Sequence, residues 1–281
     1  MRRKVESWWD SHGYNEDGTA EIGELLATKV FNHTKPKKLL QHVVNMATKG
    51  DDLVMDFFAG SGTTGHAVYA QNDADDSTRR FVLVQLPEPL DPQNSEQKAA
   101  SNFCDLIGKK RTIAELTKER LRRGALKIKA TSANKKADLG FRSFKLAHSN
   151  IRAWNPTPTD LEQAVIEYQD HVLEGRTESD ILYELLLKLG LDLCVPIEVR
   201  KVAGKDVYAV GGGVLMTCLT PAIVGADVDA LATGIVAWQK ELAPAGNTTC
   251  VFLDSAFADD VAKTNLAAIL EQHGIQNVRS L

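Results

Sequence analysis

The sequence has no apolar run long enough to cross a membrane, since a spanning helix needs about 18–20 consecutive apolar residues. The N-terminal stretch MRRKVESWWD has basic residues but lacks the apolar core of a secretory signal. We therefore expect a cytoplasmic protein without membrane attachment. The four cysteines are far apart, with no C-x-x-C pair and no histidine at metal-ligand spacing. This pattern argues against zinc and disulfides, so we expect reduced thiols and no metal site.

Composition is close to the average for globular proteins, with 43% apolar and 25% charged residues in a chain of 281. A chain of this length is expected to form two domains. The net charge of −4 gives no sign of a nucleic-acid partner, but the charge is unevenly distributed. Residues 109–136 contain eleven lysines or arginines against two acids, so they carry +9 and the remainder carries −13. The positive charge is therefore concentrated in one segment.

A strand, a helix and a second strand are expected early in the chain. LVMDFF at residues 53–58 is short and apolar and precedes glycines, as in a buried parallel strand. FVLVQL at residues 81–86 is a second buried strand of the same kind, ended by prolines. With a helix between them, these strands form a βαβ unit. Another helix is expected over residues 36–47, where proline is acceptable in the first turn.

Residues 111–129 predict a basic amphipathic helix, with apolar side chains on one side and cations along another. The stretch from there to Ala137 has little apolar content and is expected to be a linker. We place the domain boundary in it, which gives domains 1–137 and 138–281. In the second domain, strands are expected at 141–146, in a meander over 197–219 and at 249–253, with helices at 160–173 and 179–189. This part is predicted to be a smaller α+β domain.

The turn after the first strand carries the strongest functional signal. It reads DFFAGSGTTG over residues 56–65. Glycine at positions 60 and 62 lets the backbone approach a nucleotide-like ligand, and the following helix presents unpaired N–H groups to it. Residues 60–65 also fit the dinucleotide pattern G-x-G-x-x-G, which is a weak signal by itself. The turn alone therefore leaves a nicotinamide site and a tight turn without a ligand open.

Two motifs in order resemble the amino-methyltransferases of DNA, in a subgroup whose motif order is permuted. The turn is similar to the cofactor motif of that family, with Phe58 to Gly62 as the F-x-G-x-G core. Just upstream, FNHTKPKKLL at residues 31–40 resembles the short Lys-Pro segment of the permuted subgroup. The resemblance implies that this segment helps to hold the methionine end of S-adenosyl-L-methionine.

The resemblance extends to the modification subunit of type III restriction-modification systems and covers nearly the whole chain. It is carried by RFVLVQLPEP at 80–89, the helix around 118–120, DLGF at 138–141, SNI at 149–151, DSAF at 254–257 and KTN at 263–265. It implies an α/β fold, in which a partial Rossmann-like S-adenosylmethionine methyltransferase sheet precedes the α+β domain. The implied reaction is methyl transfer to adenine N6 in double-stranded DNA. The implied partners are that DNA and a restriction subunit with helicase and nuclease activity, and a homodimer is left open.

The residues expected to contact S-adenosylmethionine lie in the Lys-Pro segment, in the turn and after the second strand. They are Lys35, Pro36, Asp56, Phe58, Ala59, Gly60, Ser61, Gly62, Thr63, Thr64, Gln85 and Glu88. A carboxylate normally receives the ribose hydroxyls at the end of the second strand. This chain has Gln85 there, with Glu88 as the nearest acid, so the ribose ligand is left open between the two.

The basic helix supplies candidate contacts to DNA phosphates, because lysine and arginine give affinity that does not depend on sequence. These candidates are Arg111, Lys118, Arg122 and Lys129. A solvated helix face without a ligand is the alternative interpretation.

One element of the family is missing from the sequence. Adenine-N6 methylation requires the base to be flipped out of the duplex, stacked on an aromatic ring and hydrogen-bonded at its amino group. The family uses an Asp/Asn/Ser-Pro-Pro-aromatic motif for this, and the chain contains no Pro-Pro. In the permuted order that motif comes before the Lys-Pro segment, so we expect it in an upstream methyltransferase half before Met1.

No residue of the chain is therefore predicted to be catalytic, and the chain is expected to be a truncated methyltransferase. Two other functions remain open. One is a non-catalytic module that binds DNA or a partner subunit. The other, less favoured, is a nicotinamide-dependent oxidoreductase.

Overall fold

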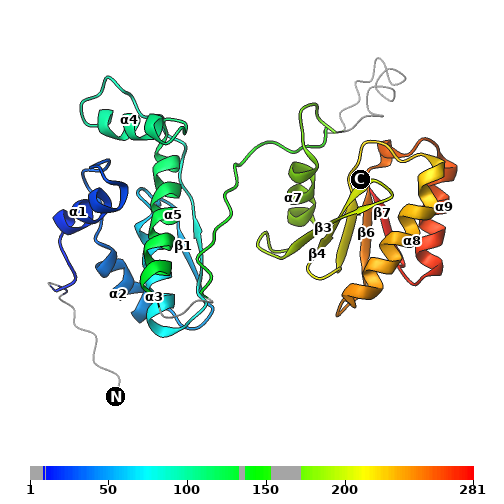
Figure 1. Cartoon of the computed structure of the whole chain (residues 1–281), viewed down its shortest axis with the longest axis horizontal. Helices are drawn as coiled ribbons and strands as arrows, with labels where there is room; N and C mark the ends of the chain where they lie inside the picture. The colour runs from blue at the N-terminus through cyan, green and yellow to red at the C-terminus, as the bar shows by residue number, and fades with distance from the viewer. Residues whose placement is uncertain (1–8, 10, 133–136, 153–171) are drawn as a thin grey trace, which may run out of the picture. The chain divides into compact units, whose positions relative to one another are not determined.

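The computed structural model describes residues 9, 11–132, 137–152 and 172–281. The chain divides into two compact units, Met1–Phe141 and Arg142–Leu281, which contain both helices and strands (Figure 1). The division falls at Phe141 rather than at 137, and the second unit is as long as the first rather than smaller. No helix in the described ranges is both long and apolar enough to span a membrane.

The first unit contains the predicted βαβ arrangement. Its elements are α1 (Asn15–Leu26), α2 (Lys37–Ala47), β1 (Leu53–Asp56), α3 (Thr63–Asp75), β2 (Arg80–Leu83), α4 (Lys98–Leu106) and α5 (Ile113–Thr131). β1 and β2 are parallel neighbours, with Leu53 opposite Arg80 and Asp56 opposite Leu83. α5 continues to Thr131, so the first residues of the expected linker are helical, and residues 133–136 lie outside the described part.

Only one face of the β1–β2 sheet is covered by helices within the described residues. Phe81 and Leu83 of β2 pack against the cluster that contains Leu121 of α5. The opposite face presents Leu53, Met55, Val82 and Val84, which are 38–53% exposed. The prediction of strands buried on both faces is therefore wrong for this chain. An apolar run shows that a strand can be buried, but burial on both faces needs a covering element on each face. Here α3 and α5 cover the same face.

The second unit is built on one mixed sheet. Its elements are α7 (Glu178–Lys188), β3 (Ile197–Val202), β4 (Lys205–Val210), β5 (Leu215–Cys218), α8 (Gly225–Leu242), β6 (Thr249–Phe252), a 3₁₀ turn (Asp254–Ala256), α9 (Asp260–Gln272) and β7 (Asn277–Ser280). The strands follow chain order across the sheet, antiparallel from β3 to β5 and parallel from β5 to β7. Helices α8 and α9 make the two crossovers, and Met216, Leu231 and Phe252 of this core are at most 1% exposed.

Several expectations for the second unit are confirmed and one is wrong. The meander, the helix that begins near residue 178 and the strand at Thr249 are present. The strand expected at 141–146 is absent: Phe141 packs with the first unit, Leu146 is 98% exposed, and these residues pair with no described strand. β7 was not predicted, since its sequence NVRS is short and has three polar residues out of four. Most of the helix expected at 160–173 lies outside the described residues, which resume at residue 172.

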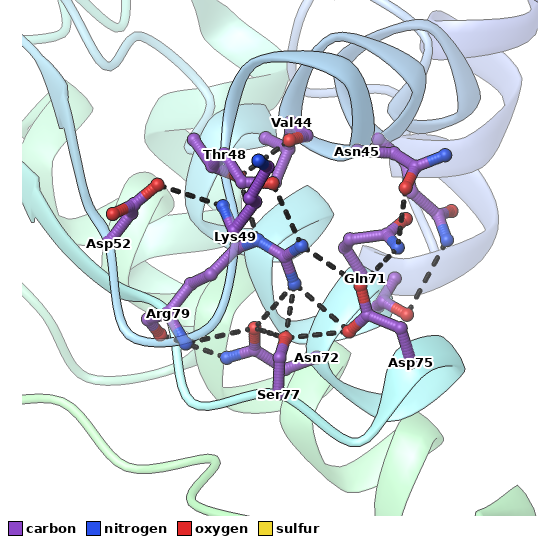
Figure 2. A network of polar contacts seen from close by, with 12 residues as sticks. Val44, Asn45, Thr48, Lys49, Asp52, Gln71, Asn72, Asp75, Ser77 and Arg79 are labelled. Carbon is purple, nitrogen blue, oxygen red and sulfur yellow. Dashed lines mark hydrogen bonds and ion pairs between the residues drawn. The ribbon is translucent and has the colours of Figure 1, made fainter. Parts of the chain in front are cut away.

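A buried arginine closes the crossover between α3 and β2 (Figure 2). Arg79 is 6% exposed, and its guanidinium donates to the Thr48 hydroxyl at 2.7 Å and the Thr48 carbonyl at 3.2 Å. It also forms an ion pair with Asp75 at 2.9 Å, and its backbone N–H donates to Asn72. The hydrogen bond from Arg79 holds the pKa of the Asp75 carboxyl well below its usual range. The ends of α2 and α3 and the start of β2 are thereby joined.

Replacing Arg79 by leucine should destabilise the first unit by about 2 kcal/mol, because Asp75 and the Thr48 carbonyl lose a buried donor. Hydrogen–deuterium exchange of α2 and α3 peptides measures this as a loss of protection of roughly 30-fold. Lys109→Leu is the control, since Lys109 is an exposed cation of the same unit. Equal protection in Arg79→Leu and Lys109→Leu would show that the network does not stabilise the unit.

Candidate functional site

The glycine turn between β1 and α3 has a backbone that requires glycine. Gly60 and Gly62 have φ values of +52° and +80°, in the left-handed region that other residues avoid. Gly62 also lies against α5, where a Cβ would be 3.1 Å from Thr117 Cγ2 and 3.3 Å from the Thr117 carbonyl oxygen. At Gly60, in contrast, a Cβ would meet only the Phe58 carbonyl oxygen, at 3.8 Å. The backbone of the turn is thus packed on one side at Gly62 and open to a ligand at Gly60.

Side chains from both strands hold this turn. Asp56 accepts hydrogen bonds from the Phe58 N–H at 3.0 Å and from the Thr64 hydroxyl at 2.6 Å. Gln85, after β2, accepts the Gly60 N–H at 2.7 Å. Asp56 and Gln85 are therefore at the turn, as the sequence led us to expect, and both act here on its backbone.

Gln85 and Glu88 differ in where they lie. The Glu88 side chain is exposed, and its backbone carbonyl accepts the Ile113 N–H at 3.1 Å at the start of α5. Of these two side chains, Gln85 is the one that bonds to the turn within the described residues. Ala59 also bonds to the second strand, through its N–H and the Val84 carbonyl, and is buried. Of the two ribose candidates, Gln85 is the one that the fold brings to the glycines.

A buried arginine that the sequence analysis did not single out reaches the same turn. Arg120 of α5 is 1% exposed, and its Nη1 donates to the Ser61 and Thr63 hydroxyls, both at 2.7 Å. The spacing of apolar residues along the helix could have identified Arg120 as buried. Arg120 stands four residues after buried Leu116 and four before buried Gly124, so it lies on the apolar side of α5.

The Lys-Pro segment packs closely on α1. Pro36 is buried and precedes the first turn of α2, and the Lys35 ammonium donates to the Asn15 side chain at 3.1 Å. Gly18 of α1 makes this approach possible, because a Cβ there would lie 2.2 Å from the Thr34 carbonyl oxygen. The side chain of Lys35 is exposed, and that of Pro36 is not.

One ion pair connects the Lys-Pro segment with the turn. Glu21 of α1 accepts the backbone N–H of Lys37 at 2.9 Å and lies 3.8 Å from Arg120 Nη2. Arg120 in turn holds Ser61 and Thr63. Glu21 also lines a pocket beside the segment, together with Ser11, Gly13, Tyr14, Asp17, Pro36 and Lys38. The two segments that the sequence analysis assigned to one cofactor are therefore joined through a single buried cation.

Parts of the chain are similar to known proteins. Residues 2–82, which include the Lys-Pro segment and the glycine turn, match the DNA methylase family. The StyLTI Mod subunit of Salmonella typhimurium, a type III restriction-modification enzyme subunit, is 38% identical over 141 residues, which are 50% of this chain and 20% of the relative. Over this matched part, the chain is similar to type III modification subunits and to DNA methylases.

Two further type III relatives extend the similarity. The EcoP15I Mod subunit of Escherichia coli is 32% identical over 196 residues, or 69% of this chain and 28% of the relative. The EcoPI Mod subunit of Escherichia phage P1 is 36% identical over 213 residues, or 75% and 31%. The EcoPI match covers 213 residues, whereas the first unit ends at Phe141. The type III similarity therefore includes part of the second unit. The chain spans 20–31% of the length of these relatives.

The cations expected to contact DNA already have partners. Three form ion pairs with neighbouring carboxylates: Arg111 with Asp105 at 2.9 Å, Lys118 with Glu115 at 2.5 Å and Arg122 with Glu119 at 3.3 Å. Lys129 also has an interaction partner. Phosphate binding by these side chains would have to compete with their present partners. They do not form a preformed phosphate site.

His66 of α3 is a second buried polar group close to Arg120. It is 7% exposed, and a Cβ on Gly124 of α5 would lie only 2.9 Å from its ring. Burial lowers the pKa of His66 to about 3, and the positive charge of Arg120 adds to the effect. His66 is thus neutral at physiological pH and packs α3 against α5.

Proposed function

We propose that the chain provides the S-adenosylmethionine-binding part of a DNA adenine-N6 methyltransferase, as a portion of a type III modification subunit. The observation that carries this proposal is the connection of the glycine turn with the Lys-Pro segment through Arg120 and Glu21. In the family that the sequence resembles, these two segments share one cofactor. A partial Rossmann-like sheet formed by β1 and β2 would place that cofactor at the carboxyl ends of the strands.

The residues at the turn fit such a cofactor. Gly60 opens the backbone to close approach, and the helix that starts at Thr63 directs unpaired N–H groups toward the same place. Gln85 or Glu88 would accept the ribose hydroxyls. The exposed Lys35 side chain would lie near the methionine carboxylate. Bound S-adenosylmethionine supplies a methyl group on a good leaving group, so the contribution of the protein is to hold it in line with the acceptor.

We further propose that a second segment, which carries the Pro-Pro-aromatic motif, completes the methyltransferase. Support comes from the exposed apolar face of the β1–β2 sheet, formed by Leu53, Met55, Val82 and Val84. Parallel sheets are normally covered on both faces, so a further element would bury these side chains. The upstream half that the family order implies is the segment we propose for it.

The remaining partners follow from the same proposal. Double-stranded DNA is the proposed substrate, with Arg111, Lys118, Arg122 and Lys129 as candidate phosphate contacts once their present partners are released. The domain from 138 to 281 is proposed to dock DNA or the restriction subunit, since the type III similarity reaches into it. A homodimer is compatible with this assignment.

Calorimetry tests the cofactor assignment. We expect the chain to bind S-adenosylmethionine and not NAD, and Gly60→Val to weaken binding at least about tenfold, or 1.4 kcal/mol, by filling the open side of the turn. Gly211→Val is the matched control, because Gly211 also has positive φ and open space around it but lies in the second unit. Binding of NAD without S-adenosylmethionine, or equal affinity in Gly60→Val and the wild type, would overturn the assignment.

A further inference from the structure

We propose that Arg120 is a positioning residue of the cofactor site, which sets the glycine turn and the Lys-Pro segment at one fixed separation through Ser61, Thr63 and Glu21. The inference rests on the proposed function and goes beyond it, since Arg120 itself is not placed in contact with the cofactor. It assigns a role to a side chain that the motif comparison left as one cation among many on a basic helix.

The burial of Arg120 is poorly explained by stability alone. Its side chain is 1% exposed, and its Nε has no hydrogen-bond partner within the described residues. Burial lowers its pKa to about 10, so the group keeps its charge near neutral pH at a desolvation cost. An apolar side chain of similar volume would avoid that cost. A charged group in this place is better explained by the groups that it holds.

On one side, Arg120 controls the conformation of the turn. Ser61 and Thr63 flank Gly62, and their hydroxyls lie 3.0 Å apart with Arg120 Nη1 at 2.7 Å from each. A single donor therefore bridges the residue whose φ is +80°. One helical turn earlier, the Thr117 hydroxyl donates to the Gly60 carbonyl at 2.5 Å. Helix α5 is therefore hydrogen-bonded to the glycine turn through two of its residues.

On the other side, Arg120 faces the anchor of the Lys-Pro segment. Its Nη2 lies 3.8 Å from Glu21, whose carboxylate also accepts the backbone N–H of Lys37 at 2.9 Å. Lys37 follows directly after Lys35 and Pro36, so this carboxylate fixes where the segment enters α2. A ligand that spans both segments needs them at one separation, and a misplacement of about 1 Å lowers the rate of reaction strongly.

The test compares Arg120→Met and Arg120→Lys with Lys127→Met, which replaces an exposed cation of the same helix. Hydrogen–deuterium exchange without ligand is the first readout. We expect Arg120→Met to increase exchange at least about tenfold in both segments, residues 31–40 and 57–65, while peptides of the second unit do not change. Arg120→Lys should restore part of the protection, and Lys127→Met should behave as the wild type. Unchanged exchange in either segment of Arg120→Met would overturn the proposal.

The second readout is affinity for S-adenosylmethionine, which we expect to fall at least tenfold in Arg120→Met. Glu21→Gln keeps an acceptor for Lys37 and removes only the charge, so it covers the case in which Arg120→Met does not fold. It should loosen residues 31–40 and weaken binding, and wild-type behaviour in both readouts would also overturn the proposal. If the wild type binds no S-adenosylmethionine, the proposed function fails, and the exchange data alone still decide whether Arg120 couples the segments.

Discussion

Purified alone, the chain should methylate adenine at least about 1,000-fold more slowly than when a segment with a Pro-Pro-aromatic motif is added in trans. The reason is chemical. The adenine base must be flipped out, and its amine must be held in line with the methyl group and lose a proton. Positioning and proton transfer contribute rate factors of this size. The chain contains no Pro-Pro for that purpose. Transfer of a tritiated methyl group from S-adenosylmethionine to duplex DNA measures the rate.

The added segment should come from a type III modification subunit and should be tested in a matched form with Ala-Ala in place of Pro-Pro. That form should bind the chain and leave the rate low, which separates assembly from catalysis. Calorimetry on the same preparation shows that the isolated chain is folded and holds its cofactor. A fast rate from the chain alone would mean that acceptor binding lies within these 281 residues and that the proposed division of labour is wrong.

Gly18→Ala should destabilise the first unit by about 3 kcal/mol and lower its affinity for S-adenosylmethionine at least tenfold. An added methyl group at this position would lie 2.2 Å from the Thr34 carbonyl oxygen and 2.6 Å from the Lys35 carbonyl carbon. Both are backbone atoms, so the Lys-Pro segment must move away from α1, with a cost typical of overpacking. Urea denaturation and calorimetry measure the two effects.

Gly23→Ala in the same helix is the control for this substitution. Gly23 has no heavy atom within 4 Å of an added Cβ, so alanine there should stabilise α1 by roughly 0.5–1 kcal/mol through helix propensity. The two substitutions are chemically identical and should have opposite signs. Stabilisation by both would show that the close approach of the Lys-Pro segment to α1 is not required.

The motifs were visible in the sequence because they are local. A short apolar run, then glycines, then a helix is enough to predict β1, the turn and α3, since each depends on near neighbours in the chain. The type III resemblance was equally accessible, and the related Mod subunits support it. The strand expected at 141–146 shows the limit, because a short segment forms a strand only where it pairs with the edge of a sheet.

The sequence by itself determined the βαβ order, the glycine turn, the Lys-Pro segment and the absence of a Pro-Pro motif. The tertiary structure decided which face of the β1–β2 sheet is covered and which cations are paired. It also decided that Arg120 joins two earlier segments of the chain, one 80–89 residues and the other about 60 residues before it. The physical reason is that periodicity shows only the direction of a side chain from its own helix or strand. What that side chain meets depends on elements brought beside it from elsewhere in the chain.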